Sequence, residues 1–300
     1  MLRTENICVR DPFIVVHEGM YYLYSSTDEE DVQKHIYVYR SRDLLEWEEP
    51  KIVFTMPVDE AFWGVKDLWA TEVHRYQGKY YAFVSIMGKH GLRGTQIAVS
   101  DTPDGEFRII TNHPATPMGR SCIDGSLYVE EGTPYIVYSF DWPDNYLADR
   151  DVYVGEIWAV QLTEDLKDMV GEPFKLFSSD EAPCSAVAPS VHGWEGKTIR
   201  RYGSDAPFVQ RLEDGSLFLT WSPIPAGNYI VGAAVSKSGK IRGDWEHIPE
   251  PIFDKNGGHA MFFRDLEGRH KMCIHQPERW LQERAVFLDV EESEGIIRVK

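Results

Sequence analysis

The chain has 300 residues, of which 43% are hydrophobic and 13% aromatic, so it can bury a large core and is not a disordered protein. Its formal net charge of −17 would repel nucleic acid and anionic membranes but leaves a neutral ligand such as a sugar unaffected. The four cysteines are spread without CxxC spacing, which argues against a zinc site or a disulfide framework.

The N-terminal residues 1–6 lack the apolar core of a signal peptide, and no later apolar run is long enough to span a membrane. We therefore expect a cytoplasmic protein. A secreted protein trimmed of its signal would have the same sequence, and the oligomeric state is not readable here.

A hairpin pattern begins at residues 10–26, where an apolar strand, a turn at Gly19 and an aromatic-rich return strand follow one another. The same template recurs at residues 68–85, 122–139, 204–222 and 258–275. Apolar positions alternate along these segments, which favours strands over helices.

Each hairpin continues into a third strand and, in most units, a short fourth segment. The third strands are expected at residues 36–41, 95–100, 151–163, 229–236 and 284–293. Five four-stranded units predict an all-β fold, a five-bladed β-propeller with four-stranded blades around a central channel. We expect one domain over residues 1–300 with no accessory module. Residues 167–203 form the main insertion, which is a lid, a subunit contact or a long loop.

The innermost strand of each propeller blade lines the channel, so the residues that open the hairpins should converge on the axis. Asp11, Asp124 and Asp205 are assigned to this head position, with His259 in the fifth unit. In the second unit Ala70 takes the head position, and Glu72, two residues further, faces the same side of the strand. A single aspartate there is usually a turn residue or a cap, but the repetition indicates a shared site.

Carboxylates gathered around a narrow channel raise the pKa of the least solvated member, so one becomes an acid while another remains a base. Hydrolysis of a glycosidic bond needs this division. Sugar rings also stack on aromatic side chains, whereas most tyrosines here are expected to pack between sheets. The candidate sugar platforms are Trp63, Trp69, Trp142 and Trp221.

Five short blocks resemble the signature blocks of glycoside hydrolase family 43, in order and over nearly the whole chain. They are Asp11-Pro12, Trp-Ala-x-Glu-Val-His at residues 69–74, Ile-Asp-Gly at 123–125, Asp-Ala-Pro at 205–207 and Gly258-His259. The resemblance implies a five-bladed propeller that hydrolyses arabinosyl or xylosyl linkages with inversion and requires no cofactor.

Carried over by position, the resemblance makes Asp11 the general base, Asp124 the residue that tunes the acid, and Asp205 the general acid. The family has Glu-Gly-Pro where this chain has Asp-Ala-Pro. An aspartate carboxyl lies on the order of 1 Å further back, a displacement that catalysis tolerates poorly. Glu72 is therefore a candidate substitute acid, with a sugar-contacting or structural carboxylate as the alternative.

His259 resembles a channel histidine that family members place near a bound cation. An axial structural calcium completed by water is one expectation and a purely structural histidine is the other. Arg10, beside the base, is expected to bind substrate hydroxyls or to form an ion pair.

Three hypotheses follow. The first is an inverting, exo-acting glycosidase on small plant-type pentose oligosaccharides, such as an α-L-arabinofuranosidase or β-xylosidase. The second is a sugar-binding or degenerate propeller without hydrolytic activity. The third is a related glycosidase acting on galactose-type or anhydro-sugar oligomers.

Overall fold

The computed structural model describes residues 1–26, 34–185, 190–194 and 197–300, and strands dominate this part of the chain, which confirms the all-β prediction. Short 3-10 turns are present at η1 (Thr4–Asn6), η2 (Trp142–Asp144), η3 (Ser179–Glu181) and η4 (Pro225–Gly227). Among the described residues, no helix has the length and apolar character needed to cross a bilayer.

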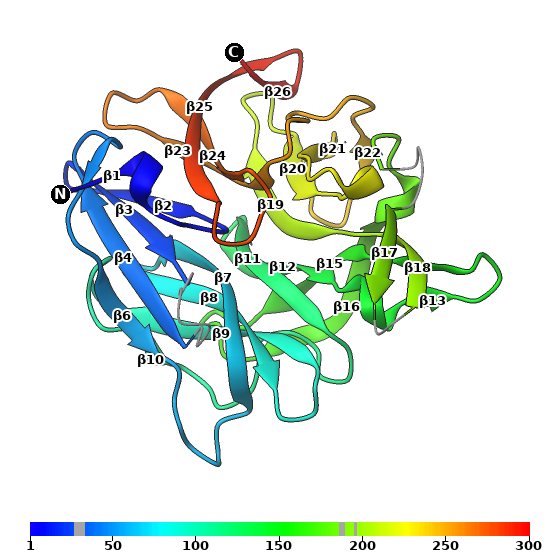
Figure 1. The fold of residues 1–300 in the computed structure, drawn as a ribbon, viewed down its shortest axis with the longest axis horizontal. Coiled ribbons are helices and arrows are strands. Elements are labelled where there is room, and N and C mark those ends of the chain that lie inside the picture. Colours follow the sequence, from blue (N-terminus) through cyan, green and yellow to red (C-terminus); the bar gives the residue numbers. More distant parts are fainter. Residues whose placement is uncertain (27–33, 186–189, 195–196) are drawn as a thin grey trace.

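The first and second sheets hold the first two predicted hairpins (Figure 1). The first sheet contains β1 (Leu2–Arg3), β2 (Phe13–His17), β3 (Met20–Ser25), β4 (His35–Ser41), β5 (Glu46–Trp47) and β6 (Lys51–Thr55), in the order β1-β5-β4-β3-β2 with β6 on β4. The second contains β7 (Gly64–Tyr76), β8 (Lys79–Gly88), β9 (Arg93–Ser100) and β10 (Arg108–Ile109), in the order β10-β9-β8-β7.

The other three hairpins begin further four-stranded antiparallel sheets. The third sheet contains β11 (Cys122–Glu130), β12 (Thr133–Phe140), β15 (Glu156–Leu162) and β16 (Met169–Ser178). The fourth contains β19 (Asp205–Arg211), β20 (Leu217–Ser222), β21 (Gly232–Ser236) and β22 (Glu246–His247). The fifth contains β23 (Gly258–Arg264), β24 (His270–Gln276), β25 (Arg284–Ser293) and β26 (Ile296–Val299).

A sixth sheet, β13-β14-β18-β17, joins β13 (Tyr146–Leu147) and β14 (Val152–Val154) to β17 (Ser190–Trp194) and β18 (Lys197–Tyr202). The third strand predicted at residues 151–163 is therefore wrong as one strand, because it divides between two sheets at Gly155. A Cβ atom at Gly155 would lie 2.3 Å from Ser204 Oγ, so only glycine fits where the chain passes from one sheet to the other. The predicted insertion likewise supplies β16, β17 and β18 rather than a plain loop.

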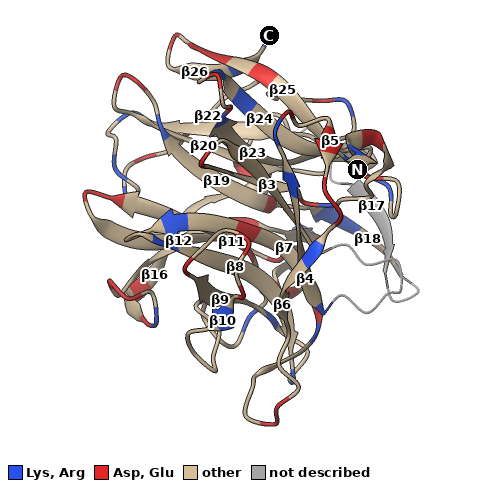
Figure 2. Cartoon of the chain, turned by 90° about the vertical axis from the view of Figure 1, so that its left-hand side faces the viewer, with Lys and Arg blue, Asp and Glu red and all other residues tan. Residues whose placement is uncertain are grey.

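The first strands of the five antiparallel sheets contact one another in chain order. The strand β2 contacts β7, β7 contacts β11, β11 contacts β19, β19 contacts β23, and β23 contacts β2 (Figure 1). Large side chains such as Trp47, Phe83, Trp221 and Phe218 are fully buried within and between the sheets. Acidic residues lie mainly in turns and strand ends, with basic residues between them (Figure 2).

The backbone at the head positions repeats from sheet to sheet. The residues in the left-handed conformation are Asp11, Ala70, Asp124, Ala206 and His259, with φ between 46° and 56°. At four of them, the pairing of first and second strands is interrupted by a bulge, which consists of the head residue and the residue after it. These five are the head residues.

The assignment of Asp205 to the head position is thus wrong by one residue. In β19 the register passes from Asp205 to Phe208, and Ala206 occupies the left-handed position inside the bulge. Asp205 lies just before it. Glycine would adopt this left-handed backbone without steric cost, whereas the Cβ of Ala206 strains it.

Neighbouring sheets are joined at the heads by side chains on the second strands. Ser85 Oγ accepts a hydrogen bond from the Asp124 amide at 2.8 Å, and Ser222 Oγ accepts one from the His259 amide at 2.8 Å. His275 Nδ1 accepts one from the Asp11 amide at 3.1 Å, which joins the C-terminal sheet to the N-terminal sheet. We call Ser85, Ser222 and His275 the latch residues.

The left-handed backbone predicts opposite tolerance of glycine at two buried alanines, Ala70 and Ala82. Ala82→Gly in β8 should lower the free energy of unfolding by about 1–2 kcal/mol, through lost burial and added chain entropy. Ala70→Gly relieves about 1–2 kcal/mol of backbone strain. Its loss of unfolding free energy should therefore be smaller than that of Ala82→Gly by at least about 1 kcal/mol. Urea unfolding of both variants measures the difference. Equal losses would contradict a strained head.

Candidate active site

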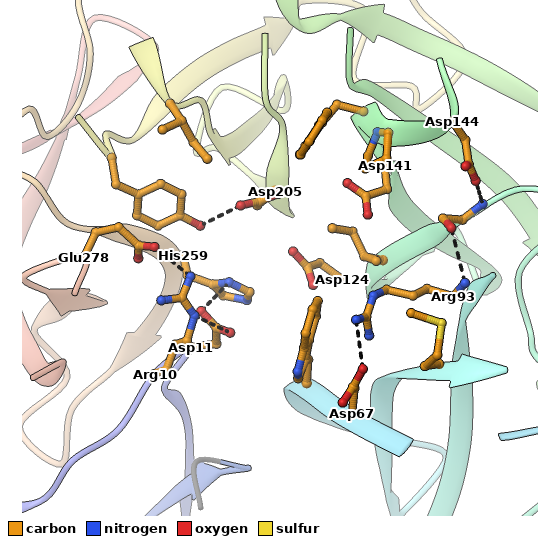
Figure 3. A pocket seen from close by; sticks show the side chains of 18 of the residues that line it. Arg10, Asp11, Asp67, Arg93, Asp124, Asp141, Asp144, Asp205, His259 and Glu278 are labelled. Atoms are coloured by element: carbon orange, nitrogen blue, oxygen red, sulfur yellow. Dashed lines mark hydrogen bonds and ion pairs between the residues drawn. The ribbon is translucent and has the colours of Figure 1, made fainter. Parts of the chain in front are cut away.

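A cavity of about 800 Å³ opens at the head ends of the sheets (Figure 3). Its wall carries acidic and basic side chains from every antiparallel sheet. The ionisable residues that line it are Arg10, Asp11, Asp67, Arg93, Asp124, Asp141, Asp144, Arg201, Asp205, Tyr229, His259 and Glu278. The structure therefore brings together the three predicted aspartates, His259 and Arg10.

Asp11 is surrounded by cationic and hydrogen-bonding groups. Its Oδ1 lies 2.9 Å from His259 Nδ1, and its Oδ2 lies 3.8 Å from Arg10 Nε. Burial alone would raise the pKa of Asp11. The charges of His259 and Arg10, with the hydrogen bond from His259, outweigh burial and hold that pKa well below its ordinary value. Asp11 is thus a carboxylate at neutral pH.

Asp205 lies in the opposite electrostatic environment. Burial, together with the carboxylates of Asp124 and Asp141, raises the pKa of Asp205 well above its ordinary value, although His259 opposes the shift. Tyr229 Oη donates a hydrogen bond to Asp205 Oδ2 at 3.4 Å. Asp205 therefore keeps its proton to a higher pH than an ordinary aspartate, in the same cavity as an ionised Asp11.

Asp124 connects the two. It is 5% exposed, and its Oδ2 accepts a hydrogen bond from the Ala206 amide at 3.0 Å, beside Asp205. Burial and the nearby Asp11 and Glu72 carboxylates raise the pKa of Asp124. Its position places one carboxyl group directly against the backbone that carries Asp205.

His259 is buried, which disfavours its protonated form. The carboxylates of Asp11, Asp124 and Glu72 nevertheless raise the pKa of His259 to about 9. The imidazolium is therefore charged at neutral pH, and its main partner is Asp11.

The predicted calcium site was tested against the same residues. Within residues 1–26, 34–185, 190–194 and 197–300, no three His, Cys, Asp or Glu side chains are grouped to hold a metal ion, and His259 Nδ1 is engaged by Asp11. These side chains alone do not form a calcium site. A calcium ion completed by water stays a prediction.

Two predicted sugar platforms lie at the cavity and two do not. Trp69 and Trp142 line the cavity, each with an arginine over its ring. Trp221 precedes the latch residue Ser222, so its side chain points to the opposite face of β20, where it is fully buried. Full burial corrects the platform prediction for Trp221. Trp63 donates its indole N–H to Gln96 Oε1 at 2.7 Å and is absent from the lining, and its platform role stays a prediction.

Glu72 was the predicted substitute acid. It is 3% exposed, it is absent from the cavity lining, and its Oε2 lies 2.7 Å from His74 Nε2. It lies on β7 two residues after the head residue Ala70, further from the cavity. The geometry corrects the substitute-acid prediction in favour of a buried structural carboxylate.

Several lining residues were not predicted, because they lie outside the repeated hairpin template. Asp67, Arg93, Asp141, Arg201, Tyr229, Glu278 and Trp280 belong to this group. Burial and the carboxylates of Asp124 and Asp144 raise the pKa of Asp141 to about 7 despite Arg93. Asp141 directly precedes the predicted platform Trp142, and this adjacency was the one available sequence signal.

The sequence matches a known protein family over most of its length. The model of the family described as "Glycosyl hydrolases family 43" matches residues 6–290. Over 150 residues the chain is 30% identical to Xylosidase/arabinosidase 43A of Humicola insolens, a match that covers 46% of this chain but only 45% of that relative. It is 26% identical over 235 residues to a xylosidase/arabinosidase of Bacteroides ovatus, covering 69% of this chain and 71% of that one.

Solved structures agree with the sequence relatives. An endo-arabinase from Bacteroides thetaiotaomicron VPI-5482 superimposes with a TM-score of 0.86 and 37% identity, covering 98% of both chains. A thermostable family-43 glycoside hydrolase gives a TM-score of 0.81 at 24% identity, covering 98% of this chain and 93% of that one. The latter likeness concerns the fold alone.

The charge environment of His259 yields a direct prediction. A pH titration followed by NMR should place the midpoint of its ring near 9, and Asp11→Asn should lower it, because Asp11 supplies the largest favourable charge and the hydrogen bond. Asp144→Asn is the matched control, because Asp144 lines the cavity but is not among the carboxylates that raise the pKa of His259. A midpoint that is unchanged in Asp11→Asn would refute the pairing.

Proposed function

Because the chain belongs to the glycosyl hydrolases family 43, we propose that it is an inverting glycosidase acting on arabinosyl or xylosyl linkages of small carbohydrates. The observation that carries the proposal is the pair of opposite pKa shifts in one cavity, lowered for Asp11 and raised for Asp205. The named activities of the relatives, xylosidase/arabinosidase and endo-arabinase, support the choice of sugar.

In the proposed reaction, Asp205 donates its proton to the glycosidic oxygen as the bond from that oxygen to the anomeric carbon breaks. A water molecule attacks the anomeric carbon from the opposite side and gives its proton to the Asp11 carboxylate. The sugar product has inverted configuration. Asp11 is left protonated and Asp205 ionised, and exchange with solvent restores both.

Asp124 acts on the acid in this scheme. Its carboxyl accepts the Ala206 amide and its charge disfavours ionisation of the adjacent Asp205. Asp205 is one methylene shorter than the family's glutamate, but it lines the cavity and has Tyr229 as a hydrogen-bond donor. These contacts support an aspartate as the acid.

We further propose that the five antiparallel sheets are the blades of one propeller domain over residues 1–300. Support comes from the contacts of β2, β7, β11, β19 and β23 in chain order with return to β2. The sixth sheet is then an insertion. It brings Trp142, through η2, and Arg201, on β18, to the cavity wall, where they would contact the sugar.

The proposed roles predict distinct losses. Nitrophenyl arabinofuranoside, xyloside and galactoside should be assayed with the parent chain, Asp11→Asn and Asp205→Asn. Loss of the base should reduce kcat by about 10²–10⁴-fold on every substrate. Loss of the acid should be milder on nitrophenyl glycosides than on oligosaccharides, since an activated leaving group needs little protonation.

Asp101→Asn, on an exposed side chain, is the control for mutation itself. NMR of the first-formed anomer tests inversion, and the size of products from oligosaccharides distinguishes exo from endo cleavage. A folded parent chain that hydrolyses neither the nitrophenyl glycosides nor arabino- and xylo-oligosaccharides would favour a sugar-binding propeller without hydrolytic activity. Activity on galactoside alone would favour the galactose-type alternative.

The pH dependence of kcat/KM should follow the two aspartates. Asp11 must be ionised, so activity is lost as pH falls through its lowered pKa, below the ordinary value of 3.8. Asp205 must be protonated, so activity is lost as pH rises through its raised pKa. Asp124→Asn removes a charge that raises the pKa of Asp205, and the basic limb should move to lower pH. A basic limb unmoved by Asp124→Asn would contradict the role given to Asp124.

A further inference from the structure

Glu278 lies behind the proposed base and contacts two of its neighbours at once. Its Oε2 lies 2.6 Å from His275 Nε2, and its Oε1 accepts a hydrogen bond from Arg10 Nη2 at 2.8 Å. Both neighbours touch Asp11: His275 Nδ1 accepts the Asp11 amide at 3.1 Å, and Arg10 Nε lies 3.8 Å from Asp11 Oδ2. One carboxylate therefore supports the base from two directions.

These contacts fix the proton on His275. Its Nδ1 accepts a hydrogen bond from the Asp11 amide at 3.1 Å and also lies 3.2 Å from Asp11 Oδ1. The amide contact places the ring proton on Nε2, where it is donated to Glu278. The ring is fully buried and stacks on Tyr229 with centroids 5.3 Å apart and planes 10° apart, which holds its orientation. The tautomer is thus set by the group that accepts at Nε2.

Arg10 depends on the same group. Its Nη1 is held by Glu283 Oε1 at 2.9 Å and its Nη2 by Glu278, which leaves Nε directed at Asp11. Burial opposes ionisation of Glu278, but the hydrogen bond from His275 and the charge of Arg10 lower its pKa, so both carboxyl oxygens are acceptors. A glutamine has only one side-chain acceptor and cannot satisfy both donors.

We propose that Glu278 is a positioning residue for the base. Through His275 and Arg10 it fixes the orientation of Asp11 in the cavity, and Arg10 also keeps Asp11 charged. This inference rests on the proposed function only in naming Asp11 as the base, since the tautomer of His275 is a property of the unliganded protein.

The first test needs no activity. The ¹⁵N NMR spectrum of the imidazole should show the His275 proton on Nε2 in the parent chain, and Glu278→Gln should shift it in part or wholly toward Nδ1. Glu283→Gln is the matched control, because Glu283 shares Arg10 but does not touch His275. A ring protonated on Nδ1 in the parent chain, or unchanged in Glu278→Gln, would overturn the proposal.

The second test is kinetic. Glu278→Gln should lower kcat by roughly 10- to 100-fold with KM nearly unchanged, and its effect should be non-additive with His275→Asn. A raised KM with unchanged kcat would make Glu278 a substrate ligand instead. A lower melting temperature with unchanged kcat and pH profile would make it merely structural. An inactive parent chain would refute the proposed function while leaving the tautomer test intact.

Discussion

Fold and site depend on one interaction, the hydrogen bond from the amide of a head residue to a side chain on the second strand of the neighbouring sheet. It is formed by Asp124 with Ser85, by His259 with Ser222, and by Asp11 with His275. Each such bond satisfies a buried donor where the left-handed backbone removes it from the strand ladder, and an unsatisfied donor would cost about 1–3 kcal/mol. The bond that joins neighbouring sheets thereby also orients the side chains at the cavity.

The junction of the last and first sheets differs from the other two because the latch is an imidazole. Each serine hydroxyl accepts the hydrogen bond of one head-residue amide. His275 accepts such a bond at Nδ1 and also contacts Glu278 through its second ring nitrogen, Nε2. The contact that joins the C-terminal to the N-terminal part of the chain is consequently the one that holds the proposed base. Arg10 reinforces it, since its partner Glu283 is at the start of β25, beside the backbone of Val9.

The repeated template made the five hairpins, Asp11, Asp124 and His259 predictable, because period-two alternation and a polar head are local features. The failures were of register and face. Asp205 and Ala206 are indistinguishable by spacing alone, and only the bulge in β19 shows that Ala206 is the head. Trp221 is an aromatic residue like the predicted platforms. Because it is adjacent to Ser222 on β20, its side chain points to the opposite face of the strand and is buried in the core. Glu278 and Arg93 lie beyond any repeat, so tertiary contacts alone reveal them.

The site separates acid from base through an asymmetry in its cations. Burial alone would protonate Asp11, Asp124 and Asp205 alike, as desolvation disfavours every carboxylate. His259 and Arg10 lie against Asp11, whereas the neighbours of Asp205 include the carboxyl groups of Asp124 and Asp141. Since the cations are held by Glu278, Glu283 and the latch, the carboxylate that remains ionised is decided by the junction of the terminal sheets. In the proposed reaction, the geometry of that junction therefore decides which carboxyl group serves as the base.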